Sequence, residues 1–466
     1  MKKIFTIALV AAVAFVGTLF APKSAEAVPS FARQVGVGCH SCHFQTVPRL
    51  NAFGRSFKLG GMTQASSALI EDDGISLPAV ANLSAIVKAR FIQGKPHEEH
   101  KLALDDAAYF EERGVVEMPD EAVLWLGGRI GENWGFATEN LSSVIKVVHS
   151  RNLGGIQAGF SLAATDAHGS ATGLELYNTG AVKNHRMFEN SAATLASVNL
   201  THYSAPAVGL SQSGGAVGMG YGEATAATFF AGNDLFFASF ALHAPGASSK
   251  AGGSLDVTDP GFGGFANMVR AAITPKLGEG MDLMVGVQMS MGTAEFSNHD
   301  YEEVAGLTPQ EQAATQLTKI KAEATVVDFQ LQMADIGHMS LEVNGAYVTI
   351  PKSEFSAPDA MGTALGLPFA YSDYKDGKIN WYNGTSKDVS GWDVNVGLGV
   401  THSLGVKLAM MGTDNGQDTG NKLSANTLGL WYDIKQNVVF HFEYSMWDGD
   451  HREFDNQMFL MLELGI

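Results

Sequence analysis

Apolar and polar residues alternate along most of the chain beyond residue 81. The first such segment ends at Phe91 and breaks the alternation once, at Ile86. A period of two sustained over about ten residues predicts a β-strand with one apolar and one polar face. The apolar positions of this segment are Leu83, Ala85, Val87, Ala89 and Phe91, and the polar ones are Asn82, Ser84, Lys88 and Arg90.

The same alternation recurs in many later segments, separated by turns rich in Gly, Asn and Asp, such as Asp414-Asn415-Gly416. Further strands are expected between 133 and 232, where the pattern is weaker. In all, the chain predicts about 16 antiparallel strands, an even number. The clearest segments lie at 121–131, 154–165, 234–243, 281–292, 322–333, 337–350, 391–402, 404–413, 423–433 and 436–446.

Segments of this length and pattern suit a transmembrane β-barrel, whose strands alternate apolar outward and polar inward. A soluble β-sandwich would show shorter strands and a more continuously apolar core. The expected fold is therefore an all-β transmembrane barrel of about 16 antiparallel strands with a small N-terminal α-helical segment. The last strand supports this fold, because it carries an unbroken apolar face to the end of the chain at Met458, Leu460, Leu462, Leu464 and Ile466.

The N-terminus reads as a signal peptide. Lys2 and Lys3 precede an apolar run over 4–20, and an Ala-x-Ala site ends at Ala27. The alternative is an uncleaved inner-membrane anchor. We expect a signal peptide at 1–27, a small segment at 28–75 and an outer-membrane barrel at 76–466.

Charge and cysteine content narrow the class of protein. The formal net charge is −18, and removing the positively charged signal makes the mature chain more acidic still. Such a surface argues against nucleic acid as a partner and favours the attraction of cations. The only two cysteines lie in one short motif, so no disulfide braces the rest of this exported chain.

That motif is Cys39-His40-Ser41-Cys42-His43. Two thiols at this spacing can form thioethers to one haem, and the histidine that follows can serve as the proximal ligand of its iron. Zinc is a poorer alternative, because consecutive Cys-His pairs rarely close a tetrahedral site. A thioredoxin-like redox pair would need a βαβ context. We therefore expect one covalent haem c.

The other haem contacts are less well specified. Met62 is a candidate distal ligand, against the simpler interpretation that it fills space. A histidine from the barrel or an open coordination site are the alternatives. Arg33, Arg55 and Lys58 are concentrated near the motif and could pair with haem propionates, or they could be solvated helix charges.

The long connections at about 94–120, 294–320 and 351–390 are polar and acidic. With periplasmic termini, the first and last hairpin loops would face outside. Their mixed carboxylate and imidazole side chains suit transient divalent iron or manganese, although solvated loop charge is the plainer interpretation. The residues are His97, Glu98, Glu99, His100, Asp105 and Asp106 in the first loop, and Asp448, Asp450, His451, Glu453 and Asp455 in the last.

The stretch from Pro29 to Met62 resembles the N-terminus of the fused cytochrome–porins that serve as outer-membrane iron oxidases in Fe(II)-oxidising bacteria. Met62 departs from the family pattern, in which an aromatic residue is expected after the glycine. The order of signal, haem segment and barrel also fits, so the resemblance extends over the whole chain. The matching features are Phe31-Ala32-Arg33-Gln34, Cys39 to His43, Pro48, Phe53-Gly54-Arg55-x-Phe57-Lys58 and Gly61.

This resemblance implies a haem held in the pore of an outer-membrane barrel. Extracellular Fe(II) would give it an electron, which would pass inward to a periplasmic cytochrome or another soluble carrier. Two alternatives stay open. The first keeps the architecture but exchanges electrons with another extracellular donor or acceptor. The second is a solute porin whose haem is only structural.

Overall fold

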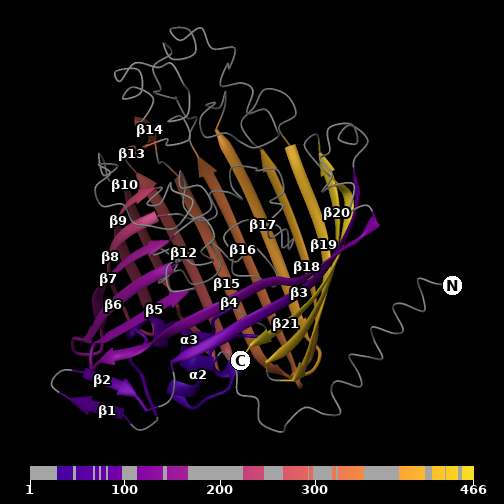
Figure 1. Ribbon diagram of the computed structural model, residues 1–466. Helices are drawn as coiled ribbons and strands as arrows, with labels where there is room; N and C mark the ends of the chain where they lie inside the picture. The colour runs from indigo at the N-terminus through magenta and orange to yellow at the C-terminus, as the bar shows by residue number, and fades with distance from the viewer. Residues whose placement is uncertain are drawn as a thin grey trace, which may run out of the picture.

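The computed structural model describes the chain in sixteen stretches, and all structural statements concern these residues. Most of them belong to a closed antiparallel β-barrel, with the small N-terminal elements at one end (Figure 1). The stretches are 29–45, 49–66, 69–72, 75–79, 82–96, 113–139, 144–165, 224–245, 266–291, 293–297, 317–321, 324–350, 388–414, 422–435, 437–449 and 454–465.

The barrel has 16 strands in the described residues, when β10 and β11 are taken as one strand interrupted at Thr274 and Pro275. It closes where β21 pairs with β3. The strands are β3 (Leu83–Pro96), β4 (Val115–Gly131), β5 (Trp134–Glu139), β6 (Val144–Asn152), β7 (Gln157–Thr165), β8 (Ala224–Gly232), β9 (Phe236–Pro245), β10 (Ala266–Ile273), β11 (Lys276–Gly278), β12 (Met281–Met291), β15 (Ala324–Ile336), β16 (Met339–Ile350), β17 (Val389–Gly399), β18 (Leu404–Asp414), β19 (Lys422–Lys435), β20 (Val438–Gly449) and β21 (Phe454–Gly465).

The two faces of the barrel wall differ in chemistry. On one face large apolar side chains are exposed, as at Val406, Leu408 and Met410 of β18. On the other face the side chains are buried and many are polar, as at Gln330 and Gln332 of β15. Apolar outward and polar inward is the pattern of a barrel that lies in lipid and encloses a polar lumen.

A closed antiparallel barrel with such an apolar outer face is the architecture of bacterial outer-membrane proteins. The chain is accordingly a porin-like outer-membrane barrel. In the described part of the chain, no helix has both the length and the apolar character needed to cross a membrane.

The N-terminal elements lie at the barrel end that carries the short turns (Figure 1). They are helix α2 (Pro29–Val35), the one-turn helix η1 (Cys39–Ser41) and helix α3 (Ala52–Leu59). Asn51 begins α3, because its side chain accepts a hydrogen bond from the Gly54 N–H at 3.0 Å. A two-stranded sheet of β1 (Leu69–Asp72) and β2 (Ile75–Pro78) then leads to the barrel.

The strand predictions are confirmed for most of the barrel, with the following corrections. The strand over 266–273 was not predicted. The expected connection at 294–320 contains β13 (Thr293–Ser297) and β14 (Leu317–Lys321), which pair as a separate hairpin. The connection expected at 94–120 is shorter than predicted. Strand β3 continues to Pro96, and β4 already starts at Val115. The β1–β2 hairpin spans the expected domain boundary at residue 75, and the proposed signal at 1–27 lies outside the described residues.

Candidate functional site

The described residues between 29 and 66, called the plug below, are held by inward-facing groups of the barrel. The Gln45 amide donates to the Ser340 and Gly397 carbonyls, both at 3.1 Å. Arg49 forms an ion pair with Glu342 at 2.5 Å, and both side chains are buried. These contacts fix the plug to β16 and β17.

Other contacts fix the plug to the opposite side of the barrel, at β4 and β6. The Ser150 hydroxyl on β6 donates to the Leu59 carbonyl at 2.8 Å. The Arg129 backbone N–H on β4 donates to the Gln34 side chain at 2.9 Å, and the Arg129 guanidinium donates to the Thr63 carbonyl at 3.1 Å. The plug thus joins strands on opposite sides of the barrel.

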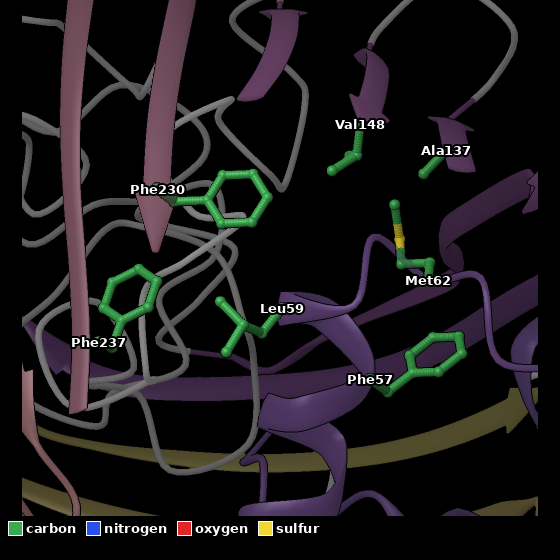
Figure 2. Packing of buried hydrophobic residues seen from close by; sticks show 7 residues of the cluster. All are labelled: Phe57, Leu59, Met62, Ala137, Val148, Phe230 and Phe237. Atoms are coloured by element: carbon green, nitrogen blue, oxygen red, sulfur yellow. The ribbon is translucent and has the colours of Figure 1, made fainter. Parts of the chain in front are cut away.

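A buried apolar cluster completes this attachment (Figure 2). Phe57 and Leu59 come from α3, and Met62 follows it. In Figure 2 the Met62 side chain points toward the wall formed by β5 and β6. The cluster consists of Phe57, Leu59, Met62, Ala137, Val148, Phe230 and Phe237.

The Cys39–His43 turn contacts the barrel at the end of β19 and at the turn between β19 and β20. The Cys39 Sγ is 4.0 Å from the Asn437 Oδ1, and the His40 Nε2 is 3.1 Å from the Asp433 Oδ2. The backbone N–H groups of Cys42 and His43 both donate to the Cys39 carbonyl, at 3.0 and 2.9 Å. This helical turn places the side chains at i, i+3 and i+4 on one side.

The chemistry of this turn fits covalent haem. Burial raises the pKa of the Cys42 thiol, because it disfavours the charged thiolate. A thioether carries no charge, so burial does not oppose it. Inward-facing apolar side chains of the barrel wall form a second buried cluster: Ile92, Ala409, Trp431, Phe459 and Met461.

The basic residues proposed for haem propionates have protein partners. Arg33 donates to the Leu83 carbonyl. Arg55 donates to the Leu50 carbonyl at 3.2 Å and to Gln330 at 3.3 Å. Burial lowers the pKa of the Arg55 guanidinium, while nearby Asp282 and Glu342 act in the opposite direction. Lys58 is half-buried on α3. A propionate role stays a prediction for all three residues.

Met62 supplies a test of the two interpretations of its side chain. Because Met62 is packed in the apolar cluster, we expect Met62→Ala to weaken plug docking by about 2–5 kcal/mol, with less than about 1.5 kcal/mol for Met62→Leu. We expect Met62→Leu to keep the wild-type visible spectrum. Loss of a methionine–iron charge-transfer band in Met62→Leu would instead assign Met62 as the distal ligand.

Of the loop residues proposed for metal, the described ones are held by local contacts. Asp448 accepts from the Gly449 N–H at 3.0 Å, and Asp455 pairs with Lys95 at 2.6 Å. The described residues contain no group of three or more His, Cys, Asp or Glu side chains placed to hold a metal. The other candidates lie outside the described residues: His97, Glu98, Glu99, His100, Asp105, Asp106, Asp450, His451 and Glu453.

The barrel residues that contact the plug were not predicted from the sequence. Glu342, Asp433 and Asn437 contact the plug, but each reads in sequence as one more polar residue of a strand or turn. The only available signal was the presence of charged residues at inward-facing positions.

No protein-family model matches the chain, and no curated protein matches it. Among solved structures, an outer-membrane OmpT of Vibrio cholerae shares 8% identity at a TM-score of 0.42, over 86% of this chain and 100% of that one. The anion-selective porin from Comamonas acidovorans shares 12% sequence identity at a TM-score of 0.43, over 83% of this chain and 99% of that one. Pseudomonas putida OprB shares 9% sequence identity at a TM-score of 0.42, over 83% of this chain and 94% of that one. The assignment of the barrel rests on its own strand pairing.

Proposed function

We propose that this outer-membrane barrel oxidises extracellular Fe(II) at a single haem c attached to Cys39 and Cys42, with His43 as the proximal ligand. Each Fe(II) loses one electron and becomes Fe(III). The electron passes to a one-electron carrier in the periplasm, such as a soluble cytochrome. Haem c would supply the one-electron centre.

One observation carries the proposal: the Cys39–His43 turn is held at the base of a membrane barrel rather than in a free soluble domain. Asp433 on β19 and Asn437, in the turn between β19 and β20, contact it. A closed barrel satisfies its own backbone hydrogen bonds in lipid and still encloses side chains. A redox group at this place would lie between the lumen and the periplasm.

The low solubility of oxidised iron favours oxidation outside the cell. Fe(III) is poorly soluble near neutral pH, so a cell gains by leaving the metal outside and importing only the electron. The acidic chain, with a net charge of −18, attracts Fe²⁺ electrostatically.

Stopped-flow mixing tests the proposal. Air-oxidised protein mixed with Fe(II) near neutral pH should develop the α-band of reduced haem. Dithionite serves as the control for a reducible haem. No α-band with Fe(II), in a sample that dithionite reduces, would exclude iron oxidation.

The second candidate is a solute porin whose haem is structural, and the polar inner face of the barrel favours it. Planar bilayers distinguish the two functions. The iron oxidase should show little steady conductance, because the plug contacts strands around the lumen. A porin should show stable open-channel currents.

A further inference from the structure

The barrel wall next to the Cys39–His43 turn carries a buried imidazole. His441 lies on the lumen face of β20, and only 2% of it is exposed. Asp433 and Asn437, the two barrel residues that contact the turn, lie shortly before His441 in the chain. The same pair of strands therefore holds the turn and carries the imidazole.

The strand register gives the position of His441 relative to the turn. Trp431 on β19 lies directly opposite His441, and Asp433 is two residues from Trp431, about 7 Å at the rise of a strand. Because β20 begins at Val438, beside the short turn, His441 is farther from the barrel base than Asp433. Two thioethers would hold a haem beside the Cys39–His43 turn, next to the wall that carries His441.

Met62, the distal ligand considered from the sequence, is directed elsewhere. Its side chain packs in the first apolar cluster and points toward β5 and β6 (Figure 2). In the barrel, β21, β3 and β4 separate these strands from β19 and β20. Met62 and the Cys39–His43 turn therefore contact different parts of the wall.

The chemistry of His441 suits an iron ligand. Imidazole is the commonest metal ligand among side chains and an axial ligand of haem iron. An iron-bound imidazole uses one ring nitrogen, and the other commonly donates a hydrogen bond that orients the ring. Ligation by His441 is therefore compatible with hydrogen bonding of this side chain inside the protein.

We infer that His441 is the distal ligand of the haem iron, on the face opposite His43; this inference rests on the haem of the proposed function. The nearest rival is Met461, which lies directly opposite His441 on β21 and has a thioether that could bind iron. Met461, however, is packed with Trp431 and Phe459 in the second apolar cluster, where it fills space between apolar side chains.

This assignment has a consequence for the donor. With His43 and His441 on its two faces, the iron would offer no open coordination position. Fe(II) would then give its electron through the haem edge, without binding to the haem iron.

Electron paramagnetic resonance of the oxidised, haem-loaded protein tests the ligand without any Fe(II). We expect wild type to show the low-spin signal of iron held by two imidazoles. His441→Ala should lose this signal and gain a high-spin one. Added imidazole should restore the low-spin signal in His441→Ala, because it fills the vacated position. The reduced variant should bind carbon monoxide, and reduced wild type should not.

Met461→Leu and Met62→Leu are the matched controls. Both keep an apolar side chain of similar volume, and both should retain the wild-type signal. Loss of the low-spin signal in Met461→Leu, with retention in His441→Ala, would assign the ligand to Met461 and overturn the inference. A high-spin signal in wild type would also overturn it, because no strong distal ligand would be bound.

A second substitution keeps the test decisive if His441→Ala does not form the barrel, as judged by heat-dependent mobility. His441→Met keeps a long side chain that can bind iron. We expect it to replace the signal of two imidazoles by a methionine–iron charge-transfer band. An unchanged spectrum in folded His441→Met would contradict the assignment.

Mixing with Fe(II) distinguishes the failure of this inference from the failure of the proposed function. If His441→Ala loses the low-spin signal but Fe(II) never reduces the wild-type haem, the iron-oxidase function fails and the ligand assignment stands. If Fe(II) reduces the wild-type haem and His441→Ala keeps the wild-type signal, the ligand assignment fails alone.

Discussion

Replacing Cys39 and Cys42 together by alanine is expected to abolish covalent haem and all Fe(II)-dependent reduction. The thioether bonds need both sulfur atoms, and the chain contains no other cysteine. The barrel should still form, because its closure depends on strand pairing and not on the motif. Haem staining after denaturing electrophoresis measures attachment, and heat-dependent mobility of the unstained band measures folding.

Two controls make this result specific. Ser41→Ala changes the same turn without touching a sulfur and should keep the stain and the Fe(II) response. His43→Ala should keep the covalent stain but alter the visible spectrum, because it removes only the proposed proximal ligand. Persistent staining in the double-alanine variant would disprove thioether attachment.

The second large effect is expected at Arg49. Arg49→Leu removes the ion-pair partner of Glu342, which is fully buried. Removing one partner of a buried ion pair costs about 3–5 kcal/mol, so the plug should open far more often. We expect increased conductance in planar bilayers and faster proteolytic cleavage between residues 29 and 66.

A second substitution shows whether this effect comes from the buried charge of Glu342 after it loses its ion-pair partner. Glu342 also accepts hydrogen bonds from Gln330 and Gln332, at 3.2 and 2.9 Å. Glu342→Gln added to Arg49→Leu keeps an acceptor for these amides and removes the buried charge. The double variant should therefore recover most of the closed state. Equal conductance in both variants would mean that Arg49 acts through packing instead.

The barrel could be predicted from sequence because each strand repeats one local rule. Apolar residues at alternate positions, as in β18 and β21, mark the lipid face directly. The alternation of apolar and polar residues is weak over β10, because Ala271 and Ala272 put similar side chains on its two faces. The β13–β14 hairpin was missed because its polar surroundings read as a loop.

The haem motif was also predictable, since its residues are adjacent in sequence. The partners of the plug were not. Arg49 and Glu342 are 293 residues apart, and no local pattern encodes their pairing. Cys39 and Asn437 come together only in the folded barrel. Both contacts depend on how distant segments pair in the folded barrel, which single-sequence patterns do not specify.

The seam between β21 and β3 has a consequence for biogenesis. The plug contacts strands on both sides of this seam, through Asp433 on β19 and Arg129 on β4. A plug outside a finished barrel would have to enter from the base and form every buried contact afterwards. We therefore expect the plug to be enclosed as the seam closes. Any group carried by Cys39 and Cys42 would then be joined to the chain in the periplasm, before the barrel is sealed in the membrane.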